Sequence, residues 1–296
     1  MFWQQAVNAI ALGAVYAVFA VGYTLIFGVL KVLNLAHAAI YMVGAFLTLY
    51  FLNAGLHLSI ALLVAMALSG GLGALLYLLV FKPIGKRKAS LQDKELLMLI
   101  VSLAASSIII SIVQMIVGVD VMRFPPDTFV ERMIQVGSLS ISVLQMTILA
   151  VSIVLMLLLR FFTLFTQTGR AMRAVAESDR TAGLLGINVE RIVMLTFFVS
   201  SALGAASGVL ISLQTNSLWV HMGSIVELKA LSIIILGGLG SISGAFLAAI
   251  LIGFIDVFST AYISSLWKDA IIFGLLFATL IVRPTGLLGT TLNRRV

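Results

Sequence analysis

The stretch IALGAVYAVFAVGYTLIFGVL (residues 10–30) contains 21 consecutive residues without a charged side chain. An α-helix rises about 1.5 Å per residue, so about 20 apolar residues cross the ~30 Å hydrocarbon core of a bilayer. The stretch therefore predicts a membrane-spanning helix. It follows directly on MFWQQ, with neither a basic segment nor a small-residue cleavage site, so we expect a span of the mature chain and not a signal peptide.

The composition extends this prediction to the whole chain. Of the 296 residues, 61% are hydrophobic and 10% are charged, whereas soluble domains have about 45–50% and about 25%. The apolar runs predict spans near residues 4–30, 38–53, 58–81, 96–118, 139–160, 191–213, 228–262 and 266–282. The run 228–262 is interrupted, so it counts as one crossing or two. We expect an all-α, polytopic membrane protein, a single domain over residues 1–296 with about eight or nine transmembrane segments, some of them discontinuous helices.

Basic residues gather in the gaps between these runs. Thirteen of the 18 Lys and Arg residues fall in the segments 82–94, 160–191 and 283–295. Because positive residues favour the cytoplasmic side, we place these segments in the cytoplasm and the segment 119–137 outside. If the runs 4–30 and 38–53 both cross, the N-terminus also lies outside. The net charge of +7 reflects this topology, and we expect no nucleic-acid partner.

Catalytic and cofactor-binding patterns are missing from the sequence. It has no cysteine, its three histidines do not form an HExxH motif, and GSISG (240–244) places its serines wrongly for a nucleophile elbow. No P-loop motif occurs either, so ATP and Mg²⁺, if they power the protein, must bind to separate subunits. We expect neither an enzyme nor a metal site in this chain.

Two polar interruptions break the apolar runs, KVLNLAH (31–37) and GGLGSISG (237–244), and GAFL follows closely on both. Helix breaks at membrane depth require protein or a watery cavity beside them, and breaks in matching places of two halves predict a transport pathway. The candidate pathway residues are Asn34, His37, Gly237, Gly238, Gly240, Ser241 and Asp256. Three alternatives remain open: GGLGSISG as a tight turn between two spans, His37 as a neutral hydrogen-bonded histidine at a helix break, and Asp256 as a helix-pairing residue.

Four further ionisable residues lie near the ends of the last apolar runs. Lys268 and Asp269 begin a run, so we expect them at the membrane interface. Glu227 and Lys229 are interpreted as marking the edge of a span.

The segment GRAMRAVAESDRTAGLLGINVERI (169–192) carries seven charges in an otherwise apolar chain. It predicts one cytoplasmic helix that ends at a glycine cap, Gly186, with Arg173 and Glu177 paired four residues apart. Its apolar side consists of Met172, Val175, Ala176 and Ala182. A helix of this kind suits docking into a groove of another protein, and the alternative is a solvated connector.

Four blocks resemble the branched-chain amino acid ABC transporter permeases, most closely their H-type subunit. They cover residues 13–46, 169–210, 228–262 and 268–289, and the segment 119–137 is the least similar. Asn34, Ala36 and His37 match the family block N-x-A-H-G, but Ala38 stands where the family usually has glycine.

The resemblance implies an importer in the bacterial inner membrane, built from two homologous permeases or two copies of one, two cytoplasmic ATP-binding subunits and an extracytoplasmic substrate-binding protein. A cytoplasmic coupling loop, about residues 161–190, would seat in the ATPase. The residues that fall on the coupling pattern are Arg170, Arg173, Ala176, Glu177, Leu184, Leu185 and Gly186. Branched-chain amino acids are the expected substrates. The alternatives are an ABC permease for urea or short amides, an ion- or proton-coupled secondary transporter, and a membrane scaffold.

Overall fold

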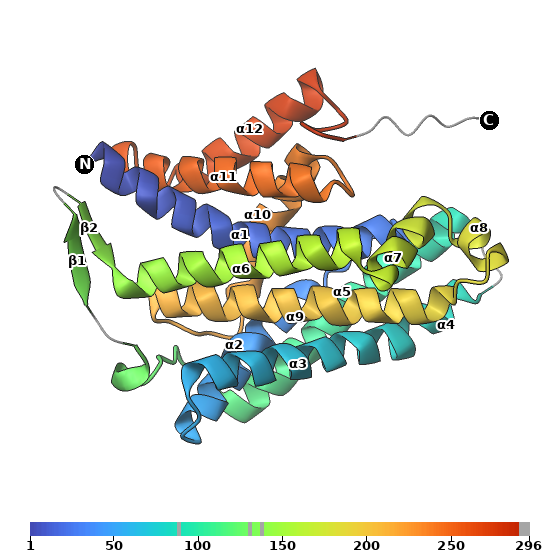
Figure 1. Ribbon diagram of the computed structural model, residues 1–296, viewed down its shortest axis with the longest axis horizontal. Helices are drawn as coiled ribbons and strands as arrows, with labels where there is room; N and C mark the ends of the chain where they lie inside the picture. The colour runs from blue at the N-terminus through green and yellow to red at the C-terminus, as the bar shows by residue number, and fades with distance from the viewer. Residues whose placement is uncertain (88–89, 130–131, 137–138, 290–296) are drawn as a thin grey trace.

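The computed structural model describes residues 1–87, 90–129, 132–136 and 139–289 and shows a bundle of long helices (Figure 1). The first half contains α1 (Phe2–Leu30), α2 (His37–Asn53), α3 (Leu58–Leu76), the π-helical turn η1 (Tyr77–Phe81), α4 (Lys82–Gly85), α5 (Leu91–Val117) and the short 3₁₀ helix η2 (Pro126–Thr128). The second half contains α6 (Val143–Phe165), α7 (Gln167–Glu177), α8 (Asp179–Leu184), α9 (Val189–Thr215), α10 (Met222–Gly237), α11 (Ile242–Tyr262) and α12 (Lys268–Val282).

Helices form in all the apolar runs that predict spans, although α5 begins five residues before its predicted run and α10 six residues before. One run starts differently. Residues 139–142 do not begin a helix, because β2 (Leu139–Ser142) pairs antiparallel with β1 (Met133–Val136). The helix α6 starts only after this hairpin, where the hydroxyl of Ser142 accepts a hydrogen bond from the Leu144 amide. It then continues to Phe165, so Arg160 lies inside the helix and not in a loop.

Six helical segments in the described part are long and apolar enough to cross a membrane. They are α1, α3 with its extension to Gly85, α5, α6, α9 and α11. The helices α2, α10 and α12 have 17, 16 and 15 residues, fewer than the roughly 20 that a perpendicular crossing needs. The expected eight or nine segments therefore require two or three of these short helices to cross as well.

The central helix of the bundle is α1, which packs against α6, α9, α10 and α11. Close approach depends on glycine both at a contact of α1 and at the contact between α2 and α9. A Cβ atom on Gly253 of α11 would lie 2.6 Å from the Gly13 Cα of α1, and a Cβ on Gly44 of α2 would overlap Ala205 of α9. Small residues thus let the backbones meet where larger apolar side chains would hold them apart.

The basic segments gather at one end of the bundle. Figure 1 shows α4, α7 and α8 at this end, called the basic end below, and the N-terminus with the β1–β2 hairpin at the opposite end. At the basic end, Glu190 of α9 forms ion pairs with Lys82 and Lys86. This arrangement agrees with the topology expected from the charges, in which the basic segments share one side of the membrane.

Candidate transport pathway and coupling element

The break between α1 and α2 puts a histidine inside the bundle. Lys31 caps α1 in the left-handed conformation (φ 58°), and the chain turns back so that α2 begins at His37. The His37 ring centroid lies 4.8 Å from that of Phe19 and 5.4 Å from that of Tyr23. Both aromatic residues lie well before the end of α1, so α2 begins within the bundle and not at its edge.

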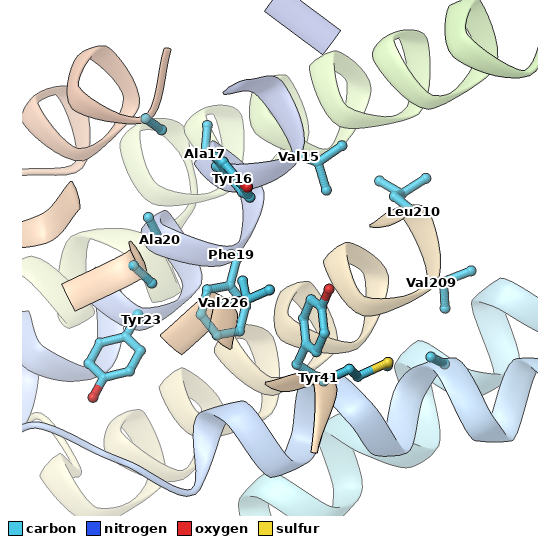
Figure 2. Packing of buried hydrophobic residues seen from close by; sticks show 14 of the residues in the cluster. Val15, Tyr16, Ala17, Phe19, Ala20, Tyr23, Tyr41, Val209, Leu210 and Val226 are labelled. Atoms are coloured by element: carbon cyan, nitrogen blue, oxygen red, sulfur yellow. The ribbon is translucent and has the colours of Figure 1, made fainter. Parts of the chain in front are cut away.

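The surroundings of His37 are aromatic and tight. Its side chain is completely buried, and neither ring nitrogen has a hydrogen-bond partner within the described residues. A Cβ atom on Gly204 of α9 would lie 2.8 Å from the imidazole Cε1. The ring of Phe19 also packs edge-on against Tyr41, with centroids 5.3 Å apart (Figure 2). The expectation of a histidine at a helix break is confirmed, but the alternative of a hydrogen-bonded histidine finds no partner in the part of the chain that the structure describes.

Asn34 shapes the turn that leads to His37. Its side-chain Oδ1 accepts a bond from the Ala36 amide (3.2 Å), and its carbonyl accepts one from the His37 amide (3.1 Å). This is the Asx-type turn that asparagine favours before a helix. The Asn34 Nδ2 is buried and has no partner among the described residues. Asn34 and His37 are thus both buried at this helix break, and a pathway role for either stays a prediction.

Asp256 belongs to a buried ion network that joins four helices. Its Oδ2 lies 2.5 Å from the Lys229 Nζ and accepts a hydrogen bond from the Tyr16 hydroxyl (2.9 Å). Asp269 contacts Lys229 at 3.4 Å, and Lys268 contacts Asp256 at 3.6 Å. The interpretation of Lys229 as the edge of a span is wrong, because its side chain is buried in the bundle. Lys268 and Asp269 are partly exposed, as expected for residues near the surface, but they also pair with α11 and α10.

The geometry of this network favours the helix-pairing alternative for Asp256. It links α1, α10, α11 and α12 with two lysines and two aspartates, so the charges balance. A balanced, hydrogen-bonded set is the form in which charges are tolerated inside a membrane protein. Glu227, two residues before Lys229, also lies inside α10 and is half-buried, so its interpretation as the edge of a span is wrong as well. Its Oε1 is buried and has no partner among the described residues.

The segment GGLGSISG forms the turn between α10 and α11. Gly237 ends α10, Gly238 and Gly240 take positive φ values of 102° and 84°, and the Ser241 hydroxyl accepts a bond from the Gly244 amide. A Cβ on Gly240 would lie 3.9 Å from the Gly28 Cα near the end of α1. The turn is therefore at the basic end, which agrees with the tight-turn alternative. A pathway role for its residues stays a prediction.

The charged segment forms two helices and not the single helix expected. Ser178 separates α7 from α8, with extended backbone (φ −157°), and its hydroxyl accepts a bond from the Thr181 amide. A serine that caps a new helix competes with continuing the old one. The predicted cap at Gly186 is confirmed: φ is 84°, and the Ile187 amide donates to the Ala182 carbonyl, as in a Schellman motif.

The apolar side of this helical pair faces the chain itself. Met172, Val175 and Ala182 are buried in a cluster with Ile26 of α1 and Phe81 of η1. This side is therefore not available as a docking surface, and that part of the sequence interpretation is wrong. Helical periodicity shows that a face is apolar but not which partner covers it.

The residues on the predicted coupling pattern lie on the other side. Ala176 is half-buried, and the remaining six are exposed: Arg170, Arg173, Glu177, Leu184, Leu185 and Gly186. Leu184 and Leu185 are 82% and 77% exposed, which is unusual for leucines outside the apolar spans. The expected pairing of Arg173 with Glu177 is not present, because the Arg173 guanidinium donates to the Thr163 carbonyl instead.

The junction between α6 and α7 is compact. The Thr166 hydroxyl donates to the Phe162 carbonyl (2.6 Å) and accepts from the Gly169 amide (3.0 Å). A Cβ on Gly169 would overlap the carbonyl oxygens of Phe162 and Thr163. The two helices therefore meet with no room for a side chain at residue 169.

Comparison with known proteins agrees with this geometry. The family described as the branched-chain amino acid transport system permease component matches residues 5–280. The chain belongs to this family. It is 32% identical to the high-affinity branched-chain amino acid transport system permease protein LivH of Salmonella typhimurium, over 97% of this chain and 96% of the relative. Identity is also 32% to LivH of Escherichia coli K12 and 31% to BraD of Pseudomonas aeruginosa, with the same coverage of 97% and 96%.

Membership establishes the permease as a homologue of the transmembrane components of branched-chain amino acid ABC importers and as a multi-pass membrane protein. It also indicates a transmembrane subunit and not an enzyme. No solved structure matches the chain.

The sequence does not reveal the role of several residues that shape these sites in the permease, and Lys229 is interpreted from it only as the edge of a span. Lys229 and Tyr16 complete the Asp256 network, and Thr166 and Gly169 fix the base of α7. Opposite charges in two consecutive apolar runs, such as Lys229 and Asp256, are a usable signal for pairing. Nothing in the local sequence indicates that Tyr16 points toward them.

Proposed function

We propose that the chain is the permease subunit of an ATP-driven importer for branched-chain amino acids in the bacterial inner membrane. Its partners are a second permease, homologous or identical, two cytoplasmic ATP-binding subunits and an extracytoplasmic binding protein that delivers the substrate. ATP and Mg²⁺ bind to the ATP-binding subunits and not to this chain. The observation that supports the proposal most strongly is the match, over 97% of the chain, to permease proteins of high-affinity branched-chain amino acid transport systems.

The coupling element, defined as residues 167–186 (α7, α8 and the cap that follows), supplies the mechanical part of the proposal. Its exposed side, with Leu184 and Leu185, lies at the basic end, where a cytoplasmic ATPase subunit would contact it. Its buried side holds Met172 and Val175 against α1 and η1. Because the interior is closely packed, a push on the exposed side moves these helices together and does not merely bend a loop.

The expected consequence is a switch between two states of the pathway. Closure of the ATPase subunits shifts α7, and the shift passes to α6 through the compact junction at Gly169 and to α1 through Met172. The break at His37 is the place where α1 and α2 can change their relative position, because no helical hydrogen bonds continue across residues 32–36. In each state the pathway is open to the substrate at one end of the bundle and closed at the other.

Reconstitution tests the proposal directly. The permease, its second permease and the ATPase subunits are placed in proteoliposomes, with binding protein and labelled leucine added, and uptake is followed with ATP, without ATP, and with only a proton or sodium gradient. We expect uptake that requires both ATP and the binding protein. Uptake driven by a gradient alone would show a secondary transporter instead. ATP-dependent uptake of urea or short amides, but not of leucine, would keep the importer and replace the substrate.

A further inference from the structure

A groove with a volume of about 520 Å³ lies between α6 and α11, a size typical of ligand sites. Eight of its 11 lining residues are apolar, among them Leu157 and Leu164 of α6 and Phe246 and Leu247 of α11. Leu159, one of the lining residues, packs in a cluster with Ala245 of α11 and with Val21 and Leu25 of α1. Figure 1 shows α1 in the space between α6 and α11 along this side of the bundle.

The groove lies in the half of the bundle nearest the basic end. Its α6 residues, 153–164, belong to the second half of that helix, and its α11 residues, 242–247, begin just after the turn at the basic end. Leu157 and Leu247 are 60% and 51% exposed, so the groove is open on the outer surface of the bundle. In a protein of this class, that surface faces lipid wherever no partner covers it.

One cation lines the groove. Arg160 is the only charged residue that lines it, and the guanidinium has no carboxylate partner among the described residues. It lies five residues before the end of α6, about 7.5 Å along the axis, where an arginine reaches the level of lipid phosphates. The Ser243 hydroxyl lines the same groove and is a second hydrogen-bond donor; that of Thr163 is already bonded to the Leu159 carbonyl.

We propose that this groove is a binding site for an anionic phospholipid of the cytoplasmic leaflet. The phosphate pairs with Arg160 and accepts a bond from Ser243, and one acyl chain lies along the apolar wall formed by Leu157, Phe246 and Leu247. An unpaired guanidinium at this depth requires an anion, and no acidic side chain lines the groove to supply one. A zwitterionic lipid brings its own ammonium group close to the arginine, so it binds less well.

The absence of cysteine allows a clean test of this site. A bimane fluorophore is attached to the Leu157→Cys variant of the full chain, which is reconstituted with equal mole fractions of brominated phosphatidylglycerol or brominated phosphatidylcholine of identical acyl chains. We expect phosphatidylglycerol to quench with about fivefold higher apparent affinity, the ratio for roughly one favourable charge at the membrane surface. A Leu63→Cys label on the exposed side of α3 reports ordinary lipid contact without such a preference.

Variants locate the preference. Arg160→Gln should equalise quenching by the two lipids, whereas Arg123→Gln, with the same charge change at an exposed position outside the groove, should leave the preference intact. If Arg160→Gln fails to insert, Leu247→Trp fills the groove and should lower quenching by phosphatidylglycerol to the level of phosphatidylcholine. The proposal is overturned if the two lipids quench the Leu157→Cys label equally, or if the preference survives both Arg160→Gln and Leu247→Trp. It is also overturned if neither lipid reaches the label at residue 157, because a protein partner then covers the groove.

Discussion

The Nζ atom of Lys229 lies 2.5 Å from Oδ2 of Asp256, and the two side chains are only 6% and 7% exposed. This pair connects α10 to α11 across the turn at Gly238, and the Tyr16 hydroxyl adds α1 to the same carboxylate. A buried ion pair adds little net stability over apolar residues, but the loss of one partner leaves an uncompensated charge. The pair therefore predicts that a single substitution lowers the amount of folded protein and that a double substitution restores most of it.

We expect Asp256→Leu to reduce the amount of folded permease strongly, with a cost of about 3–5 kcal/mol, because the Lys229 ammonium loses its nearest counter-charge. The double variant with Lys229→Met should recover most of the folded protein. Fluorescence-detected size exclusion and thermal unfolding in detergent measure both. A loss in the double variant equal to the sum of the losses in Asp256→Leu and in Lys229→Met alone would show that the pair has no energetic coupling.

A second prediction concerns the cap of α8. Gly186 has φ 84°, a conformation that valine adopts only with strain, so Gly186→Val should disorganise the end of the coupling element without affecting the apolar spans. Glu177→Lys, at an exposed position at the end of α7, should have the same functional effect by reversing a contact charge. We expect normal insertion but ATP hydrolysis without matching uptake in proteoliposomes.

Glu95→Lys is the matched control for Glu177→Lys, because it reverses an exposed charge on α5 outside the coupling element. It should transport as the parent does. Normal transport by both Gly186→Val and Glu177→Lys would show that α7 and α8 do not couple hydrolysis to transport.

The exposed leucines give a third prediction. Leu184 and Leu185 are the most exposed large apolar side chains of the coupling element. Leu185→Asp should weaken association with the ATPase subunits by roughly tenfold or more, because burying an unpaired carboxylate at an interface costs more than about 1.4 kcal/mol. Co-purification at several salt concentrations measures the loss. Leu266→Asp, an 89% exposed leucine in the loop between α11 and α12, should leave association unchanged.

Much of the fold follows from the sequence because the bilayer imposes a simple rule. Apolar runs of the required length become helices, and α1, α2, α9 and α12 begin and end within two residues of the predicted limits. The cap at Gly186 was also predictable, because a glycine after a run of helix formers has one common use. These features depend on local sequence.

The features that could not be predicted depend on contacts between distant segments. Lys229 and Asp256 are 27 residues apart, and only the packing of α10 against α11 brings them together. The break at Ser178 is marginal locally, since the same residues also suit a continuous helix. The burial of Met172 depends on α1 and η1, which no periodicity within residues 169–186 reveals.

The base of the coupling element supplies a fourth prediction. Gly169→Val requires Phe162 and Thr163 to move, because even a Cβ atom overlaps their carbonyl oxygens. Overpacking of this kind costs about 1–3 kcal/mol, so the permease should still fold but α7 should meet α6 at a changed angle. We expect reduced coupling of ATP hydrolysis to uptake. Gly183→Val is the control, because an added Cβ there lies 3.8 Å from its nearest neighbour; coupling that is equal in both variants would contradict the prediction.

Two carboxylates on neighbouring helices allow a final comparison with the same chemical change. Asp256→Asn removes the charge that balances Lys229, whereas Glu227→Gln removes a charge for which no partner is found in the described structure. An unpaired carboxylate oxygen inside a membrane protein is costly, so its replacement by a neutral amide should not lower the thermal stability and should raise it by up to about 1–3 kcal/mol. Asp256→Asn should lower it, because Asp269, at 3.4 Å, replaces the lost partner only in part. Thermal unfolding of the two variants side by side measures the difference. A loss of stability in Glu227→Gln equal to that in Asp256→Asn would mean that Glu227 also has an ionic partner in the assembled protein.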